Sequence, residues 1–265
     1  MINNPAYDEW LARRIAVRSA DAAISQGAVR FSLLTTVYER TDAALFAETA
    51  KSLEQQIFAY SEWIILAHGP VSPALNSELL SLEMNGKARV FREPVNLGIV
   101  GGMRFCLDRA AGDYIIPMDA DDLLTPDALR LMAQEILRHA FPAYLYSDED
   151  HLIDNRLAAP YWRPDWDPIL HLASCYIWHL VAIRRDVALA VDAYCDRDAE
   201  YCHDWDTTFR IADAGYEPIH LPEVLYHWRQ HTHSISNNPD PHKGTRLSTR
   251  LVCERVIRGL DRPHL

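Results

Sequence analysis

The chain has 265 residues, of which 49% are hydrophobic, and its 37 acidic and 26 basic residues give a net charge of -11. This length and apolar content suffice for one large domain with a full core. The acidic balance excludes the basic footprint of a nucleic-acid-binding protein, so we expect no nucleic-acid partner. We find neither an apolar run long enough to span a membrane nor a signal peptide, which favours a cytoplasmic enzyme.

Residues 1–29 are predicted to form an N-terminal helical extension. Apolar and basic residues alternate at helical spacing from Trp10 to Arg18. A helix packed on the main domain is favoured over a membrane-surface helix because the basic content is small. Any membrane contact should therefore be peripheral, at the inner face.

From Arg30 onward, predicted strands and helices alternate. The expected strands cover residues 31–38, 62–67, 88–92 and 114–118, and the expected helices cover 42–56, 72–85, 96–110 and 126–139. Thr41 or Asp42 is placed to cap the first of these helices. Such alternation predicts an α/β fold with a mostly parallel sheet flanked by helices, and ligands at the carboxyl ends of the strands.

The strand over 114–118 runs into Asp119-Ala120-Asp121-Asp122. In an extended backbone, Asp119 and Asp121 leave the same face and can share one hard divalent cation, Mg²⁺ or Mn²⁺. The alternative is that these acids cap the following helix, which Leu123-Leu124-Thr125-Pro126 is expected to open. The spacing alone leaves both interpretations open.

A second strand that ends in acids is predicted over 143–151, with Asp148, Glu149 and Asp150 near its end. Residues 152–172 are rich in Pro, Trp and Asp, which predicts an irregular loop that lines a pocket. The remaining elements are strands over 174–184 and 217–221, a helix over 204–214 ended by Gly215, and a helix over 244–259.

Several motifs in this order resemble the inverting GT-A glycosyltransferases of family 2, which build bacterial surface polysaccharides such as O antigens. They are Thr36-Val37-Tyr38-Glu39-Arg40, Asn96-Leu97-Gly98, Asp119-Ala120-Asp121-Asp122, Tyr146-Ser147-Asp148-Glu149-Asp150, Arg163-Pro164-Asp165-Trp166, His203-Asp204-Trp205-Asp206 and Tyr226-His227-Trp228-Arg229. The resemblance implies a GT-A (Rossmann-like) domain over residues 30–236, followed by a C-terminal loop and helix over 237–265. Such a domain is sometimes one module of a longer enzyme.

The resemblance also implies an activity and a set of site residues. A hexosyl or deoxyhexosyl group would pass from a nucleotide-diphosphate sugar to a glycan or lipid-linked acceptor, with Mg²⁺ or Mn²⁺ neutralising the diphosphate. The metal ligands would be Asp119, Asp121 and His227, and the nucleotide-sugar contacts Thr36, Tyr38, Glu39, Asn96, Arg104, Asp119, Ala120 and Asp121. The residues placed near the donor sugar or acceptor are Asp148, Glu149, Asp150, Trp166 and His203.

Asp204 occupies the position of the family's catalytic base, which takes a proton from the acceptor hydroxyl. Its alternative role is the N-cap of the helix that it opens. For His227 the alternative to metal binding is a structural ring beside Trp228. Asp148, Glu149, Asp150 and Trp166 could equally order a loop.

Three departures from the family pattern stand out. Ala67-His68-Gly69-Pro70 replaces the Asp that reads the nucleotide base, Arg104 is shifted by one position, and His203 stands where Glu or Gln is frequent. A degenerate GT-A domain that binds a glycan or a partner without turnover is therefore an alternative. A nucleotidyltransferase is disfavoured, because the first strand is not followed by a glycine-rich basic phosphate loop.

Overall fold

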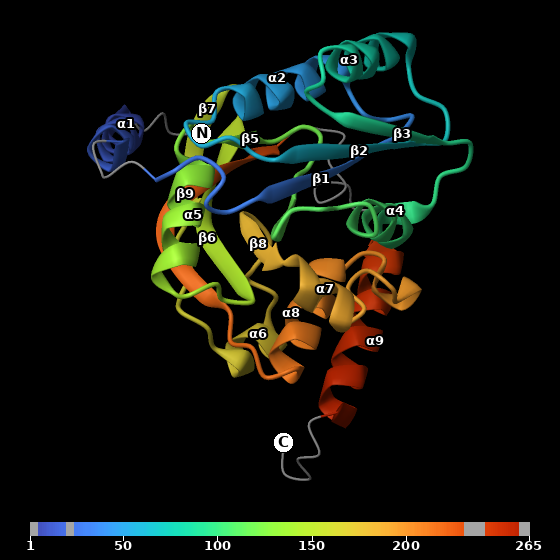
Figure 1. Cartoon of the computed structure of the whole chain (residues 1–265). Helices are drawn as coiled ribbons and strands as arrows, with labels where there is room; N and C mark the ends of the chain where they lie inside the picture. The colour runs from blue at the N-terminus through green and yellow to red at the C-terminus, as the bar shows by residue number, and fades with distance from the viewer. Residues whose placement is uncertain (1–4, 20–23, 231–241, 260–265) are drawn as a thin grey trace.

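The computed structural model describes residues 5–19, 24–230 and 242–259. They form a nine-stranded sheet in the order β3-β2-β1-β4-β8-β6-β9-β5, with β7 paired to β6 (Figure 1). The strands are β1 (Phe31–Val37), β2 (Glu62–His68), β3 (Arg89–Glu93), β4 (Tyr114–Pro117), β5 (Leu123–Leu124), β6 (Tyr144–Ile153), β7 (Arg156–Tyr161), β8 (Val181–Arg184) and β9 (Ile219–Gln230). The helices are α1 (Pro5–Ser19), α2 (Ala43–Glu54), α3 (Pro73–Met84), α4 (Gly98–Leu107), α5 (Ala128–Arg138), α6 (Pro168–Ala173), α7 (Arg185–Ala190), α8 (His203–Asp213) and α9 (His242–Gly259), with a 3₁₀ turn at Arg197–Ala199.

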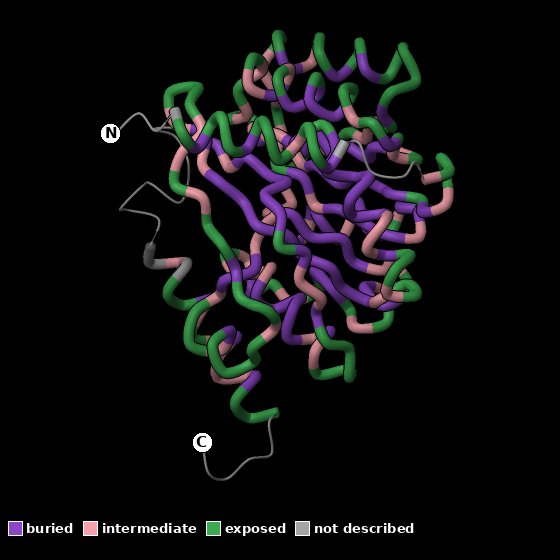
Figure 2. The backbone as a smooth tube through the Cα atoms, turned by 90° about the vertical axis from the view of Figure 1, so that its left-hand side faces the viewer, coloured by how far each residue is buried: buried purple, intermediate pink, exposed green. Residues whose placement is uncertain are grey.

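One half of the sheet is parallel, because β1 pairs with β2 and β4, and β2 pairs with β3, all in the same direction. Strands β1, β2 and β4 are buried on both faces and are mostly apolar. Strand β3, at the edge, is partly exposed and carries charged residues. Leu33 and Trp63 face a core shared with α2, α3 and α5, whereas Leu34 and Ile64 face a second core shared with α4 and α7. Figure 2 shows the buried backbone concentrated in the strands and the exposed backbone in the surrounding helices.

Helices α2 and α3 begin where the sequence predicts, whereas α4 begins at Gly98, two residues after its predicted start. The Asp42 side chain accepts hydrogen bonds from the backbone N–H groups of Ala44 and Leu45, and Ser72 caps α3 in the same way through Leu75. These caps satisfy N–H groups that the first turn of a helix leaves unpaired. The alternating half of the fold is therefore encoded locally.

The other half of the sheet mixes directions. β8 runs antiparallel to both β4 and β6, β9 is parallel to β6, and β5 and β7 are antiparallel to their neighbours. Six strands, β1 to β4, β6 and β9, still run the same way. The prediction of a mostly parallel sheet flanked by helices is confirmed.

Two predictions in this half are wrong. Leu123 and Leu124 do not open a helix; they form β5 opposite His227 and Tyr226 of β9, and α5 begins only at Ala128. The acids at 119–122 therefore do not cap α5. Their capping alternative is excluded, because β5 separates them from the helix.

Residues 152–172 are also not an irregular loop, because they contain β7 and α6. Asp154 and Asn155 form a two-residue turn between β6 and β7 with φ values of 51° and 60°. Both residue types tolerate this left-handed conformation, which a tight hairpin requires. Asp167 then caps α6 by accepting from the N–H groups of Ile169 and Leu170.

Other boundaries also moved. The strand predicted over 174–184 is confined to 181–184, α8 begins one residue before Asp204, and β9 extends the strand predicted over 217–221 as far as Gln230. Helix α7 and the 3₁₀ turn were not predicted. The turn-rich loop expected from Asn237 lies mostly outside the described residues, while the expected terminal helix corresponds to α9.

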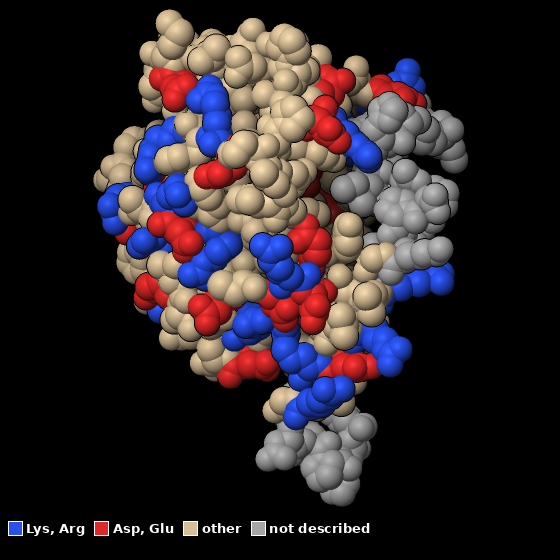
Figure 3. Space-filling model, turned by 90° about the vertical axis from the view of Figure 1, so that its right-hand side faces the viewer, with Lys and Arg blue, Asp and Glu red and all other residues tan. Residues whose placement is uncertain are grey.

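Helix α1 packs on the domain as predicted. Tyr7 and Leu11 form a small apolar cluster with Val224 of β9, and buried Arg18 pairs with Asp127 and Glu223. Within the described ranges no helix is long and apolar enough to cross a membrane. Basic and acidic side chains are interspersed over the face drawn in Figure 3.

Candidate active site

The acidic loop Asp119–Asp122 leaves the carboxyl end of β4 and is fixed from two sides. Thr35 of β1 donates a hydrogen bond to the carbonyl of Met118 at 2.8 Å. Arg229 of β9 donates its backbone N–H to Asp122 at 2.7 Å and its Nε–H to the carbonyl of Asp121 at 2.6 Å. The loop is therefore held by strands from both halves of the sheet.

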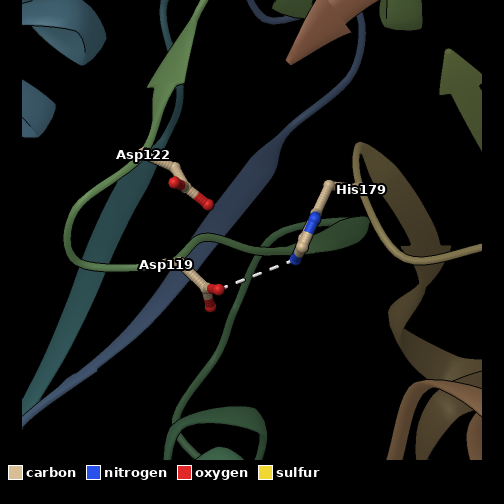
Figure 4. Close-up of side chains that lie close together, drawn as sticks. All are labelled: Asp119, Asp122 and His179. Atoms are coloured by element: carbon tan, nitrogen blue, oxygen red, sulfur yellow. Dashed lines mark ion pairs between the residues drawn. The ribbon is translucent and has the colours of Figure 1, made fainter. Parts of the chain in front are cut away.

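Asp119, Asp122 and His179 form the centre of the site, and their side chains point toward one another in Figure 4. One ligand atom from each lies within 4.8 Å of the other two. The Oδ2 atom of Asp119 is 3.6 Å from Nε2 of His179. Two carboxylates and an imidazole are suitable ligands for a hard or borderline divalent cation such as Mg²⁺ or Mn²⁺.

This group differs from the one expected on an extended backbone. Ala120 and Asp121 form a turn, so Asp119 and Asp121 no longer alternate along a strand, and the premise of their shared face is wrong. Asp122 takes the second place beside Asp119. Asp121 stays next to the group, because its charge acts on both Asp119 and Asp122.

His179 is held in position by two contacts. Its ring stacks on Tyr226 of β9, with centroids 4.5 Å apart and planes at 10°, and its Nδ1 lies 3.2 Å from the Oε2 atom of buried Glu149. Burial alone would lower the pKa of His179, but the hydrogen bond to Glu149 and the charges of Asp119, Glu149 and Asp122 raise it to about 10.

The carboxylates around His179 repel one another. Burial, followed by the charges of Asp119 and Asp121, raises the pKa of Asp122 well above its ordinary value, even though Tyr226 donates a hydrogen bond to its carboxylate at 2.6 Å. The pKa of Asp119 is raised by desolvation and then by Asp121 and Asp204, although its side chain is 59% exposed. A bound cation would relieve this crowding, so the residues fit a metal.

Glu149 links this centre to the interior. Its carboxylate lies 3.0 Å from Nη2 of Arg163, and both side chains are fully buried. Burial would raise the pKa of Glu149, but Arg163 and the hydrogen bond to His179 lower it. Glu149 therefore stays ionised and keeps the His179 ring oriented, which is the usual role of a carboxylate behind a histidine ligand.

Asp204 lies at the start of α8, and its charge is felt by Asp119. The N-cap of α8 is Cys202, which makes no side-chain capping hydrogen bond, so the capping alternative for Asp204 is wrong. Its Oδ1 atom is 3.3 Å from Nδ1 of His203, which also acts electrostatically on Asp119. Asp204 and His203 therefore lie within electrostatic range of Asp119, and the role of Asp204 as the base stays a prediction.

The residues expected to contact the nucleotide lie at different distances from the acidic loop and differ in their partners. Tyr38 lies within the electrostatic reach of Asp121, and Glu39 is exposed beside it. Thr36 lies under α4, where a Cβ on Gly102 would approach its methyl group to 2.9 Å. Asn96 accepts a hydrogen bond from the Gly98 N–H at 2.8 Å and so shapes the turn into α4.

Arg104 and His68 are committed to other partners. Arg104 pairs with Asp108 at 2.8 Å and with Cys195 at 2.9 Å, on the α7 side of α4. His68 is buried, its pKa is lowered by burial, and its Nδ1 accepts the Leu97 N–H at 3.1 Å. The neutral His68 ring therefore carries its proton on Nε2, where it could serve as a hydrogen-bond donor.

The acids of the second motif, Asp148, Glu149 and Asp150, are buried, and each is bound to other side chains. Asp148 accepts hydrogen bonds from the Arg163 N–H and from His220, each at 2.9 Å, and Asp150 accepts one from Tyr7 at 2.7 Å. These contacts support the loop-ordering alternative for Asp148 and Asp150. Trp166 packs against His171, with ring centroids 5.2 Å apart.

His227 lies outside the Asp119 group. Its Nδ1 is 2.5 Å from Oδ1 of Asp150, and its neighbour Tyr226 stacks on His179. Because successive side chains of a strand point to opposite faces, His227 and His179 lie on different sides of β9. The structure thus offers His179 as the histidine beside the acidic loop.

Sequence reasoning did not single out His179, Asp122 or Tyr226 as residues of the candidate site. His179 immediately precedes the apolar residues of β8, and this is the signal that could have identified it. The amino end of an antiparallel strand lies at the carboxyl edge of its parallel neighbours. The strand predicted over 174–184 included this position, but no direction was predicted for that strand.

More than half of the chain matches the model of one protein family. The profile described as glycosyl transferase family 2 matches residues 32–190. The matched range contains the acidic loop and His179, and it ends before Asp204.

The individual relatives described next are each less than 30% identical to this chain. The O-antigen biosynthesis protein RfbC of Myxococcus xanthus is 28% identical over 95% of this chain, but the chain spans only 20% of that protein. The amylovoran biosynthesis glycosyltransferase AmsE of Erwinia amylovora is 22% identical over 74% of each chain. Among solved structures, S. aureus TarS 1–349 in complex with UDP-GlcNAc has a TM-score of 0.68 at 15% identity, over 84% of this chain and 65% of that one. This likeness confirms the GT-A fold.

Proposed function

Because the chain belongs to glycosyl transferase family 2, we propose that it transfers a sugar, with inversion, from a nucleotide-diphosphate donor to a glycan or lipid-linked acceptor during surface-polysaccharide synthesis. The naming of RfbC and AmsE supports the polysaccharide context. The TarS complex suggests a uridine nucleotide as the first donor to test. The chain spans only a fifth of RfbC, so the proposal concerns the activity of this chain and not that of a protein as long as RfbC.

One observation carries the proposal. Two carboxylates and a histidine converge beyond the end of β4, and Asp204, at the start of α8, is near enough for its charge to raise the pKa of Asp119. A glycosyltransferase needs both parts, because the diphosphate leaving group requires positive charge and the acceptor hydroxyl requires a base.

The roles follow from the contacts. Asp119, Asp122 and His179 would hold Mg²⁺ or Mn²⁺, which when bound supplies the charge that offsets the departing diphosphate. Asp121 and Tyr38 lie beside them on the nucleotide side. Asp204 accepts the proton of the acceptor hydroxyl, with His203 adjacent to orient its carboxylate. Glu149 and Tyr226 hold His179 in place.

Calorimetric titration of nucleotide diphosphates, UDP first, tests the donor site. We expect binding that requires Mn²⁺ and that is lost in Asp119→Asn. The matched pair His179→Ala and His227→Ala decides which histidine supports the metal, with a loss of about 10- to 100-fold expected in Mn²⁺ affinity for the former alone. The reverse result would return the metal role to His227, and nucleotide binding that is unaffected by chelation would refute the metal assignment.

Turnover separates the proposal from its main alternative. A degenerate domain would bind nucleotide or glycan without releasing free nucleotide diphosphate. Incubation with a panel of nucleotide sugars and oligosaccharide acceptors, followed by detection of the released nucleotide, should show activity in the wild type. Nucleotide binding without release for every donor in the panel would favour the degenerate domain.

A further inference from the structure

Three large aromatic side chains form a continuous group beside the candidate active site. Tyr161 at the end of β7 stacks on Trp178, with ring centroids 5.5 Å apart and planes at 26°, and Trp178 lies 6.2 Å from Trp228 of β9. We call these three residues the aromatic wall. They come from three separate segments of the chain, so the fold, not a local motif, assembles the wall.

The wall adjoins the centre of the site. The Trp228 ring lies 6.2 Å from the ring of His179, whose Nε2 faces Asp119. Strand alternation gives the same placement, because Tyr226 and Trp228 share one face of β9 and Tyr226 stacks on His179. In the neighbouring strands, Tyr161 pairs with Glu149, and Glu149 pairs with Tyr226. The wall therefore continues the surface that carries His179.

The wall lies at the edge of the core, because Trp228 packs against the main apolar cluster but is not enclosed by it. Tyr161 is 37% exposed, and Trp178 and Trp228 are each only partly buried. The guanidinium of buried Arg163 supports the wall from the protein side, 5.1 Å from the Tyr161 ring and 5.7 Å from the Trp178 ring. Since Arg163 is itself bound to Glu149, the wall and His179 share one buried anchor.

Half-exposed rings next to a sugar-transfer site have a specific chemical use. The C–H groups on one side of a pyranose carry small positive partial charges, and the face of an aromatic ring is negative. Stacking also buries the apolar side of the sugar while its hydroxyl groups remain free to hydrogen-bond. A nucleotide diphosphate, by contrast, is held chiefly by cationic groups. The wall has none, because its polar hydrogens are two neutral indole N–H groups and one phenol O–H.

We propose that the aromatic wall of Tyr161, Trp178 and Trp228 binds a pyranose ring of the acceptor glycan. This inference rests on the proposed function. It assigns acceptor recognition to the hairpin of β6 and β7 and to the segment before β8, and it leaves donor binding to the acidic loop. The wall would thus position the acceptor next to the centre from which the donor sugar departs.

The chain provides a matched control for the wall. Trp162 follows Tyr161 directly and is 51% exposed, yet its ring contacts Trp10 of α1 at 5.3 Å, away from Trp178. Trp162→Leu therefore removes an exposed ring of the same type without touching the wall. Tyr161→Leu and Trp178→Leu remove wall rings, and Trp178→Phe retains an aromatic face.

The test is saturation-transfer NMR on the full chain with a panel of methyl pyranosides: gluco, galacto, manno, N-acetylgluco and rhamno. We expect transfer from the wild type to the ring C–H protons of at least one glycoside. The apparent affinity should fall about 2- to 10-fold in Tyr161→Leu and Trp178→Leu, the range that an aromatic contact supports. It should be retained in Trp162→Leu and largely restored in Trp178→Phe.

Several results would overturn the inference. They are the absence of transfer to every glycoside in the wild type, equal affinity in the wall variants, and an equal loss in Trp162→Leu. A loss of nucleotide-sugar affinity in the wall variants, with glycoside binding unchanged, would assign the wall to the donor. The glycoside measurement needs no nucleotide, so it judges the wall even if nucleotide binding, and with it the proposed function, fails.

Discussion

Two buried histidines on the same segment, His171 and His179, have opposite surroundings. His171 in α6 is enclosed by the rings of Trp166, Tyr176 and Phe209, and among the described residues neither of its ring nitrogens has a hydrogen-bond partner. Burial lowers its pKa to about 3. The pKa of His179 is raised to about 10, because carboxylates outweigh the effect of burial.

The contrast shows that burial alone does not decide the charge of a histidine. In the His179 region, Glu149, Asp119 and Asp122 provide partners for a positive charge or for a metal. In the His171 region, only aromatic rings surround the imidazole. We infer that the first region is built for chemistry and the second for packing, and the predictions below test that division.

Helix α8 joins the two regions, and this gives the sharpest test. The charge of Asp204 raises the pKa of Asp119, whereas the indole N–H of the next residue, Trp205, donates to the carbonyl of His171 at 2.6 Å. Asp204→Asn should lower turnover by roughly 10²- to 10⁴-fold, because the amide cannot accept the proton. Nucleotide affinity and melting temperature should change little. Trp205→Phe should instead lower the melting temperature and leave turnover per folded molecule nearly unchanged.

Steady-state transfer rates, nucleotide titration and thermal unfolding of both variants check this division. Near-native turnover in Asp204→Asn would exclude it as the base. If nucleotide binding were lost instead, Asp204 would belong to the donor site. A Trp205→Phe variant that folds normally but loses turnover would contradict the division into a chemical and a packing region.

The next prediction concerns removal of one buried charge, that of Glu149, from the His179 region. Glu149→Gln keeps the shape of the side chain but leaves the fully buried Arg163 without a counter-charge. Breaking a buried pair in this way costs about 3 to 5 kcal/mol of unfolding free energy. Urea unfolding should show this loss. The control is Glu48→Gln, whose side chain is 50% exposed beside Arg229 and should cost less than about 1 kcal/mol. Equal losses would mean that burial does not distinguish the pairs.

The aromatic region should make stability depend on pH. Because His171 has a folded-state pKa of about 3 and an ordinary value of 6.5, the unfolded chain binds the extra proton between these limits. Stability should therefore fall as pH drops below about 6.5, by up to about 1.4 kcal/mol per pH unit from this residue. Denaturant unfolding of wild type and His171→Phe between pH 7 and 4.5 isolates the contribution of His171 to the pH dependence of stability. Identical pH slopes would show that His171 is not held neutral.

The sequence predicted the parallel half of the fold because its signals are local. Asp42 and Ser72 cap their helices, and the buried strands read as apolar runs. The mixed half depends on distant pairings that no local pattern announces. Two leucines become β5 only because β9 lies beside them, and β9 continues through residues that hold the centre of the site.

The candidate site divides in the same way. Asp119 and Asp204 could be predicted because each belongs to a motif at the end or start of an element. His179 could not, since its place depends on an antiparallel strand inserted between β4 and β6. Asp122 replaces Asp121 beside Asp119 because the chain turns where an extended strand was assumed. The local sequence thus shows where the acids lie along the chain, whereas the pairing of distant strands determines which of them lie close together.

The smallest expected effect concerns the His171 ring itself at neutral pH. His171→Phe removes two buried nitrogens that lack partners among the described residues, and it preserves the backbone carbonyl that binds Trp205. Leaving a buried polar group unsatisfied costs about 1 to 3 kcal/mol, so its removal should stabilise the protein. Fitting a slightly larger ring offsets part of this gain. We expect a net gain of about 1 kcal/mol by urea unfolding at pH 7, with turnover unchanged. A clear loss of stability would mean that the imidazole nitrogens are hydrogen-bonded in solution, for example to buried water, and that the aromatic region is less purely apolar than its rings suggest.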